Sequence, residues 1–200
     1  MGDTTKSAQK RKYIIEKARE VFASKGYKTV TMKDIVDACD ISRGGLYLYF
    51  GSTAEIFMAV LNSEVDEDDD EAIDRALKND ASAGDMLALF LKEQKKTILK
   101  KKNNLTFATY EYFSENRVSP ADNPIRTQFE TAVRIVERLI ENGMESEEFY
   151  CEDPMGCARN LMYVIEGLKV TSSTMGITEE MIDRELMYVL KGLVPYEAEY

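Results

Sequence analysis

The sequence contains no histidine and no tryptophan. Histidine is the side chain that most often serves as a general base at neutral pH and as a transition-metal ligand. Its absence excludes Ser-His-Asp and Cys-His catalysis and removes the usual donor of a metal site. Proline and glycine are also scarce, with 4 and 11 residues in a chain of 200. This scarcity favours helices over a turn-rich β architecture.

Cysteine is a third residue type in short supply. The three cysteines, Cys39, Cys151 and Cys157, are an odd number, and no two of them form a C-x-x-C pair. This pattern argues against a disulfide scaffold and against a zinc site, and it suits a reducing cytoplasm. We therefore expect a protein that carries neither a metal nor a cofactor.

Long apolar segments are absent as well. The longest stretch without a charged residue covers residues 44–54, whereas a membrane-spanning helix needs about 20 apolar residues. The N-terminal sequence MGDTTKSAQKRK contains no apolar segment of the kind that a signal peptide carries. The sequence thus predicts a cytoplasmic protein without a membrane span.

Charge is distributed unevenly along the chain. The formal net charge is −10, yet residues 1–50 contain more lysine and arginine than aspartate and glutamate. A basic N-terminal segment joined to an acidic remainder is typical of a chain whose first part meets a polyanion. A solvated surface with a modest excess of lysine has the same composition, so charge alone leaves both interpretations open.

Apolar residues recur at helical spacing along most of the chain. Near the N-terminus, Ile14, Ala18 and Phe22 mark one face of a helix that we expect to end at Gly26. A later long helix is expected to be closed by Gly143 in the same way. Helices are expected over residues 8–25, 32–39, 43–49, from 52 or 53 to 61, from about 84 to 102, 105–116, 125–142, 154–175 and 178–193.

Two of these helices, over residues 32–39 and 43–49, are short and are joined by about three residues. This arrangement is typical of a helix-turn-helix, whose second helix is the recognition helix. Arg43 lies at the end of that helix that usually faces the bases, and arginine can bond to a guanine edge through two hydrogen bonds. Gly44 and Gly45 leave room for the backbone to approach a groove closely.

The apolar and aromatic residues of the second helix have different expected roles. Leu46 and Phe50 are four residues apart, so they share an apolar face and are expected in the core. Tyr47 and Tyr49 lie on different sides of the helix, and their hydroxyl groups suit contacts with phosphate. Packing in the core is the alternative role for both tyrosines, and the sequence leaves it open.

The segment that carries these residues reads G-Y-K-T-V-T-M-K-D-I-V-D-A-C-D-I-S-R-G-G-L-Y-L-Y-F-G-S-T-A-E-I-F. It resembles the DNA-binding head of the TetR family of transcriptional repressors, and the resemblance covers roughly residues 10–61. The register is specific, because it includes the Gly-Tyr helix end, the Thr-Met before the second helix and the Ile-Ser-Arg-Gly-Gly-Leu-Tyr-Leu-Tyr-Phe run. The rest of the chain matches the family only in length and helical character.

The resemblance implies roles for individual residues. Arg43 and Gly44 fall where the family reads base edges, and Lys33 falls where some members also reach a base. Thr31 falls at a capped helix start near the DNA backbone. Phosphate contacts are implied at Gly45, Tyr47 and Tyr49. The residues expected to contact DNA are Thr31, Lys33, Ser42, Arg43, Gly44, Gly45, Tyr47, Tyr49 and Thr53.

Two positions depart from the family's pattern. The family usually has lysine where this chain has Thr53, and that lysine normally meets a phosphate. A hydroxyl group and a helix N-terminus can still bind phosphate. The family also favours glycine in the turn, where this chain has Asp40, a residue that tolerates the left-handed conformation better than most. Together the departures imply weaker and more salt-sensitive DNA binding than is usual for the family.

We expect an all-α protein with a three-helix DNA-binding head over residues 1–53 and a helical domain for effector binding and dimerisation over residues 54–200. The last two helices, about 154–175 and 178–193, are apolar over more than half of their circumference. Such helices must bury two sides, so a second copy of the chain is expected to cover one of them in a four-helix bundle. A homodimer also reads two half-sites that lie about 34–36 Å apart, or a multiple of that distance.

A pocket for a small apolar or aromatic effector is harder to place. Glu166 stands inside an otherwise apolar run, and a buried acid needs a partner in the protein or in a ligand. An exposed position at the rim of the dimer is the alternative for this residue, and ordinary core packing is the alternative for the whole set. The candidate lining residues are Phe90, Phe107, Tyr110, Phe113, Phe129, Met162, Tyr163 and Glu166.

The interpretation that joins these features is a homodimeric repressor that binds palindromic double-stranded operator DNA and is released by its effector. The alternative is a helical small-molecule-binding or interaction protein with weakened DNA recognition, which Thr53, Asp40 and the acidic net charge favour slightly. An enzyme is disfavoured, because the sequence lacks histidine and any glycine-rich phosphate loop. No residue is assigned a catalytic role.

Overall fold

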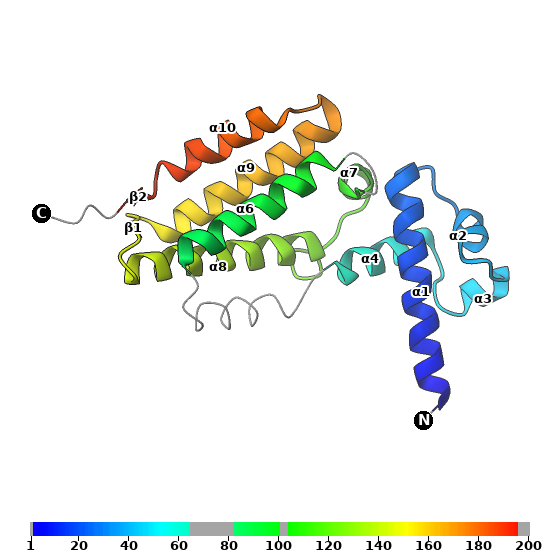
Figure 1. The fold of residues 1–200 in the computed structure, drawn as a ribbon. Coiled ribbons are helices and arrows are strands. Elements are labelled where there is room, and N and C mark those ends of the chain that lie inside the picture. Colours follow the sequence, from blue (N-terminus) through cyan, green and yellow to red (C-terminus); the bar gives the residue numbers. More distant parts are fainter. Residues whose placement is uncertain (1, 65–81, 101–103, 196–200) are drawn as a thin grey trace, which may run out of the picture. The chain divides into compact units, whose positions relative to one another are not determined.

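The computed structural model describes residues 2–64, 82–100 and 104–195, and most of them are helical (Figure 1). The fold class expected from the sequence, all-α, is confirmed. The helices are α1 (Gly2–Lys25), α2 (Met32–Cys39), α3 (Arg43–Tyr47), α4 (Thr53–Ser63), α6 (Ala83–Leu99), α7 (Thr106–Glu115), α8 (Pro124–Glu145), α9 (Pro154–Thr174) and α10 (Glu179–Leu190). Within the described segments, no helix is both long enough and apolar enough to cross a membrane.

Two very short strands complete the secondary structure. The strands β1 (Phe149–Tyr150) and β2 (Val194–Pro195) pair antiparallel, with Phe149 opposite Pro195 and Tyr150 opposite Val194. They join the segment between α8 and α9 to the segment that follows α10. The sequence does not predict these strands, because two residues are too few to show an alternating pattern.

The chain divides into two compact units. The first unit holds α1 to α4 together with α7, and the second holds α6, most of α8, α9, α10 and both strands. The helix α7 therefore packs with the N-terminal helices, although α6 precedes it in the sequence. These units are defined by packing alone. The boundary after residue 53, between a DNA-binding head and a domain for effector binding and dimerisation, therefore stays a prediction.

The first unit is built around α1, which contacts α2, α4 and α7. Ile14, Ala18 and Phe22 form its fully buried face, as the helical spacing predicted. Leu46 from α3 and Phe50 from the following turn are also buried, so their expected place in the core is confirmed. The two residues hold α3 against the rest of the unit, and this leaves the opposite side of α3 in solvent.

Glu111 of α7 forms hydrogen bonds with the segment that connects α1 and α2. The helix α1 ends at Gly26, whose φ is +79°, as expected for a glycine in the left-handed conformation. One carboxylate oxygen of Glu111 accepts hydrogen bonds from the backbone N–H groups of Tyr27 (2.6 Å) and Lys28 (3.1 Å). This contact ties α7 to the segment that leads into α2.

Two helix boundaries near the N-terminus differ from the prediction. α1 begins at Gly2 and not near residue 8, because residues 5–12 are exposed and carry no apolar stripe that the sequence analysis could follow. α3 ends at Tyr47 and not at residue 49. After Tyr47 the chain forms a tighter turn, in which the N–H of Tyr49 donates to the carbonyl of Leu46 (2.9 Å). Phe50 follows this turn and is buried in the core.

The expected helix end at Gly143 is wrong. α8 continues through Gly143 to Glu145, and the chain reaches a positive φ of 58° only at Glu147. The ring of Phe149 lies against the α-carbon of Gly143, where a β-carbon would collide with it. Glycine is needed here for the close approach of an aromatic ring rather than for a left-handed stop.

The second unit is a helical layer in which α9 packs against both α6 and α10 (Figure 1). Its core is formed by apolar side chains from all four helices, among them Leu87, Val136, Leu161 and Ile182. Polar contacts tie α6 to its neighbours, since Lys95 forms ion pairs with Glu179 (2.7 Å) and Asp183 (2.6 Å) on α10. The hydroxyl group of Ser172 on α9 donates to the carbonyl of Ile98 (2.6 Å).

The N-terminus of α6 is capped by a glutamate from a distant part of the sequence. Glu148 accepts hydrogen bonds from the N–H groups of Ala83 (2.9 Å) and Gly84 (2.8 Å) and from the hydroxyl group of Ser82 (2.6 Å). These bonds, above all the one from Ser82, lower the pKa of Glu148 from 4.5 to about 2. The charged form of this carboxylate therefore stabilises the folded chain.

We predict that Glu148→Gln lowers the free energy of unfolding at pH 7 by about 1–2 kcal/mol, because a charged cap at a helix N-terminus is lost. The folded-state pKa is depressed, so this contribution is present above pH 4.5 and disappears as the pH falls toward 2. Urea unfolding at pH values from 7 to 2.5 measures both effects. The control is Glu145→Gln at an exposed position; equal acid sensitivity of Glu148→Gln and wild type contradicts the role of the cap.

Candidate nucleic-acid interface

The helices α2 and α3 are joined by a three-residue turn, as a helix-turn-helix requires. Asp40, the first residue of the turn, has a φ of 51° and a ψ of 48°, in the left-handed region. Few residues other than glycine adopt this conformation readily, and aspartate is one of them. The expectation that Asp40 takes the place of a turn glycine is confirmed.

The start of α2 is fixed by a reciprocal pair of hydrogen bonds. The N–H of Asp34 donates to the side-chain oxygen of Thr31 (3.3 Å), and the N–H of Thr31 donates to the carboxylate of Asp34 (2.8 Å). Lys25 also forms an ion pair with Asp34 at 2.5 Å. Lys25 and Thr31 hold the pKa of Asp34 far below its usual range. The side chain of Thr31 thus lies at an exposed helix start, where the sequence placed it.

The first turn of α3 is exposed and carries little side-chain bulk. Ser42 is the N-cap, and its hydroxyl oxygen accepts a hydrogen bond from the N–H of Gly45 (3.1 Å). Arg43 and Gly44 are both exposed, and a β-carbon added to Gly44 would meet no atom within 4 Å. The guanidinium of Arg43 lies 5.7 Å from the centre of the Tyr47 ring. The backbone of α3 is therefore open to a partner at Gly44, with a cation beside it.

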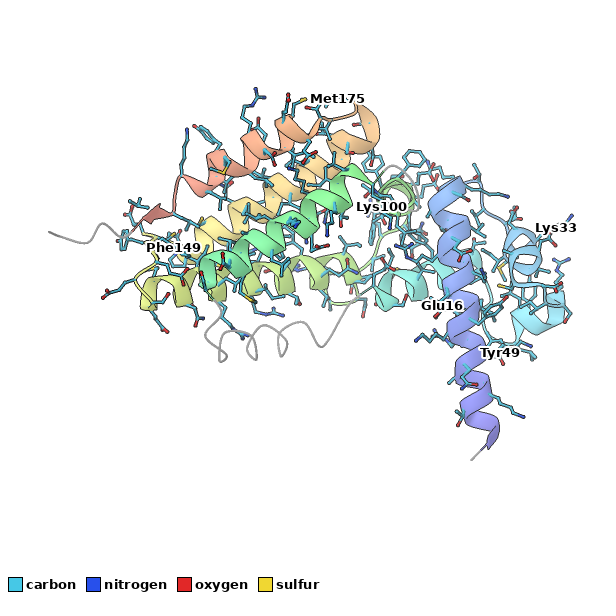
Figure 2. The ribbon with its side chains drawn as sticks, in the orientation of Figure 1. Glu16, Lys33, Tyr49, Lys100, Phe149 and Met175 are labelled. Carbon is cyan, nitrogen blue, oxygen red and sulfur yellow. The ribbon has the colours of Figure 1, made fainter. Side chains whose placement is uncertain are left out.

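The two tyrosines of this segment have different environments. Tyr47 is exposed at the end of α3, whereas Tyr49 is half-buried and packs against the core of the first unit. Core packing, the alternative role for the two tyrosines, thus applies to Tyr49 and not to Tyr47, and a phosphate contact of Tyr47 stays a prediction. Lys33 is exposed in the first turn of α2 and projects away from α1 (Figure 2).

Leu48 is a surface residue of this region that the sequence analysis did not single out. Its side chain is 83% exposed, which is unusual for leucine. The helical spacing contains the signal, because Leu48 is two residues from both Leu46 and Phe50 and so lies on the opposite side of α3 from the core. An apolar side chain at the end of a recognition helix can contact a thymine methyl group.

Thr53 is the first residue of α4. Ser52 is the N-cap of this helix, and its hydroxyl oxygen accepts from the N–H of Glu55 (3.2 Å). Thr53 itself is half-buried and uncharged. Eight of the nine expected DNA-contacting residues thus lie on α2, on α3 or in the turns that border them, and Thr53 begins the next helix.

The candidate effector residues divide between the two compact units. Phe107, Tyr110 and Phe113 belong to α7 in the first unit, where Phe107 and Tyr110 are exposed and Phe113 is half-buried. The other five, Phe90, Phe129, Met162, Tyr163 and Glu166, belong to α6, α8 and α9 in the second unit.

Within the second unit, only part of the set forms an aromatic contact. The rings of Phe129 on α8 and Tyr163 on α9 lie 5.0 Å apart, and Met162 is buried in the core. Of the two alternatives left open for Glu166, burial and exposure, the structure shows exposure, because its side chain is 42% exposed and pairs with Lys169 at 2.7 Å. The two residues are three apart on one helix face, where a surface ion pair satisfies the carboxylate. An effector role for these residues stays a prediction.

The described residues contain no group of three or more histidine, cysteine, aspartate or glutamate side chains arranged to hold a metal ion. The polar side chains of α2 and α3 instead face outward around an open stretch of backbone. This arrangement suits recognition of a groove and its flanking phosphates.

Comparisons with known proteins match both parts of the chain. Residues 14–60 match the family model described as "Bacterial regulatory proteins, tetR family", and residues 86–183 match one described as "Tetracyclin repressor-like, C-terminal domain". A similar sequence is an uncharacterised HTH-type transcriptional regulator, YfiR, of Bacillus subtilis. It is 29% identical over 143 residues, which are 71% of this chain and 69% of YfiR.

Solved structures share the fold at low sequence identity. The reduced form of NemR from E. coli superposes with a TM-score of 0.76 at 14% identity, covering 94% of this chain and all of NemR. A gamma-butyrolactone receptor described as ArpA-like superposes with a TM-score of 0.58 at 19% identity, covering 95% of this chain and 90% of the receptor.

Proposed function

Since the chain belongs to the TetR family of bacterial transcriptional regulators, we propose that it is a cytoplasmic repressor that binds palindromic operator DNA as a homodimer. The observation that carries this proposal is the exposed first turn of α3, where Arg43 stands beside the open backbone of Gly44. In this role α3 enters the major groove. Arg43 forms two hydrogen bonds to a guanine, and Tyr47 contacts a phosphate.

The other expected DNA-contacting residues complete the interface in this proposal. Lys33 reaches a base edge or a phosphate from the first turn of α2, and Leu48 contacts a thymine methyl group. The N–H groups at the start of α4, near Thr53, bind a phosphate in place of a lysine side chain. Thr31, Ser42, Gly45 and Tyr49 set the position of α2 and α3 more than they contact DNA, because each is engaged in a cap or in the core.

Exposed apolar side chains on α9 and α10 support dimerisation through these two helices. On α9, Tyr163, Gly167 and Val170 recur at intervals of four and three residues, so they share one face. Tyr163 and Val170 are exposed, and a β-carbon added to Gly167 would meet no atom within 4 Å. On α10, Met181 and Tyr188 are exposed seven residues apart. A second copy of the chain would cover these faces and form a four-helix bundle.

The proposed effector is a small apolar or aromatic molecule bound in the second unit near Phe129, Met162 and Tyr163. The adjacent rings of Phe129 and Tyr163 offer a face for stacking, and Phe90 lies half-buried on the same core. An effector releases the operator only if it binds one arrangement of the two DNA-binding heads better than the other.

We predict that selection from a random duplex library recovers a palindrome with the wild-type protein. Arg43→Gln should weaken binding to that palindrome by about 1–3 kcal/mol and relax the preference at one base pair of each half-site. Fluorescence anisotropy with the palindrome and its single-base variants measures both effects. Lys17→Gln is the control, because Lys17 is paired with Glu20 on α1. Absence of any enriched sequence would favour the alternative, a helical binding protein with weakened DNA recognition.

For the dimer we predict that Val170→Asp raises the dissociation constant of the two protomers by roughly a hundredfold or more, because an unpaired charge would be buried. Sedimentation velocity over a range of protein concentrations measures this change. Leu89→Asp is a matched control, since Leu89 is an exposed apolar residue on α6 and is somewhat more exposed (56%) than Val170 (45%). Dissociation by both variants, or by neither, contradicts an interface at this face.

For the effector we predict that one class in a panel of apolar and aromatic compounds lowers operator affinity at least about tenfold at saturation. Lactones belong in the panel, because a protein of similar fold is named a gamma-butyrolactone receptor. Phe129→Ala should raise the effector concentration needed for half-release and leave operator affinity without effector unchanged. Anisotropy titrations measure both, and an effector that binds without changing operator affinity overturns the mechanism.

A further inference from the structure

The cations on α1 and just after it fall into two groups, and the first group is neutralised within the protein. Its members lie in the second half of α1 or just after it, and each pairs with a carboxylate. The pairs are Lys17 with Glu20 (3.1 Å), Arg19 with Glu64 (2.7 Å), Lys25 with Asp34 (2.5 Å) and Lys28 with Glu115 (2.9 Å). These ion pairs link parts of the folded chain, and the paired cations therefore contribute little net positive potential that could attract a partner.

The second group occupies the first half of α1. Lys6, Lys10, Arg11 and Lys12 are all exposed, and residues 5–15 include no acidic residue. Among the residues that the structure describes, none of these four forms an ion pair. Unneutralised like charges on one short segment repel each other, and an anionic partner removes that repulsion.

Two contacts place this segment beside the recognition helix. The hydroxyl group of Tyr13 donates to the carbonyl oxygen of Cys39 at 3.5 Å, so this side of α1 faces the end of α2. Lys10 and Lys6 precede Tyr13 by three and seven residues and therefore continue the same helix face. The guanidinium of Arg11 lies 5.0 Å from the centre of the Phe50 ring, just beyond α3. The first turns of α1 then extend past α2 and α3 (Figure 1).

The position of Arg11 matters because the neighbouring segment has no charge of its own. Residues 44–54 include the end of α3, the following turn and the start of α4, and none of them is charged. A cation beside this connection must therefore come from another element, and the ring of Phe50 holds Arg11 there. Lys12 lies on a third side of α1, about 200° from Lys10 and about 100° from Arg11, and four residues before Glu16.

We propose that Lys6, Lys10 and Arg11 form a phosphate-binding strip that contacts the DNA backbone beside the bases read by α3. The inference rests on the proposed function and adds a second part of the chain to the interface. DNA carries one negative charge per about 1.7 Å of its axis, so a strip of cations along α1 can meet successive phosphates. Such contacts fix the position of α3 in the groove and carry no sequence information.

The test is the salt dependence of binding to two duplexes, the selected operator and a scrambled sequence of equal length and composition. Each cation that meets a phosphate contributes about 0.9 to the slope of log affinity against log salt. A dimer carries every residue twice, so Arg11→Gln and Lys10→Gln should each lower the slope by about 1.8. Affinity should fall roughly tenfold or more for both duplexes alike.

Matched variants separate the strip from general effects. Lys12→Gln removes the same charge from the same turn of α1 but from a different face, and it should leave the slope close to that of wild type. Arg11→Lys should keep the slope, because it keeps the charge. Thr53→Lys in the Arg11→Gln background should restore it, because it returns a cation to the connection between α3 and α4. Circular dichroism checks that every variant keeps its helix content.

The outcomes distinguish the strip from the proposed function. If Arg11→Gln and Lys10→Gln have the same salt-dependence slope as Lys12→Gln while wild type still prefers the operator, the proposal of a phosphate-binding strip is overturned and the proposed function stands. If wild type shows no preference between the duplexes, the proposed function fails. The slopes on the scrambled duplex then still decide whether the strip binds phosphate.

Discussion

The position of α3 depends on the burial of Leu46 and Phe50. A helix of five residues with two glycines in its first turn is not stable alone, because nucleation is unfavourable and glycine disfavours helix. Its conformation is imposed from one side by these two buried side chains and from its start by the cap at Ser42. The opposite side is left with Arg43, the open backbone of Gly44 and the exposed Leu48. A recognition surface of low intrinsic stability is thus held by its own buried face.

That buried face belongs to a larger core, which also contains an aromatic cluster. The ring of Phe57 on α4 contacts Phe22 of α1 (4.8 Å), Tyr27 (5.2 Å) and Tyr112 of α7 (5.2 Å). Glu111, next to Tyr112, accepts hydrogen bonds from the backbone just after Gly26. Rings and carboxylate together join α7 to the connection that leads into α2. The position of the helix-turn-helix is therefore linked to a helix far away in the sequence.

The predictions from sequence were most accurate where residues close together in the chain determine the structure. The bounds of α2, the left-handed Asp40 and the caps at Thr31 and Ser42 follow from residues within four positions of each other, and each was predicted. The prediction that a helix ends at Gly143 was wrong, because this glycine is needed for the approach of the Phe149 ring. That ring contacts Gly143 only after the chain has turned back, so residues next to Gly143 in the sequence do not show the contact. For Glu166 the sequence left burial and exposure open, because periodicity locates a helix face but does not show that a lysine three residues away pairs with the carboxylate.

The nine residues expected to contact DNA were predicted as a set from a resemblance, but the division proposed above into contacting and supporting residues was not. That division depends on exposure and on hydrogen bonds, and no pattern in the sequence fixes either quantity. Tyr47 and Tyr49 are two residues apart and chemically identical, yet one is exposed and the other packs against the core. Leu48 lies between them and is 83% exposed, although leucine is a residue type that is usually buried.

The acidic net charge does not oppose DNA binding in a chain arranged like this one. Asp34, Glu64 and Glu115 are the partners of Lys25, Arg19 and Lys28, so these carboxylates are neutralised where they stand. Charges farther than about 10 Å from a phosphate are screened at 0.1 M salt, so the net charge of the whole chain has little effect on a local contact. The sign of the electrostatic potential at the interface is set by the cations that lack a carboxylate partner. In the described part of the first unit these include Arg43, which begins α3, and the cations at the start of α1, of which Arg11 lies against Phe50 just beyond α3.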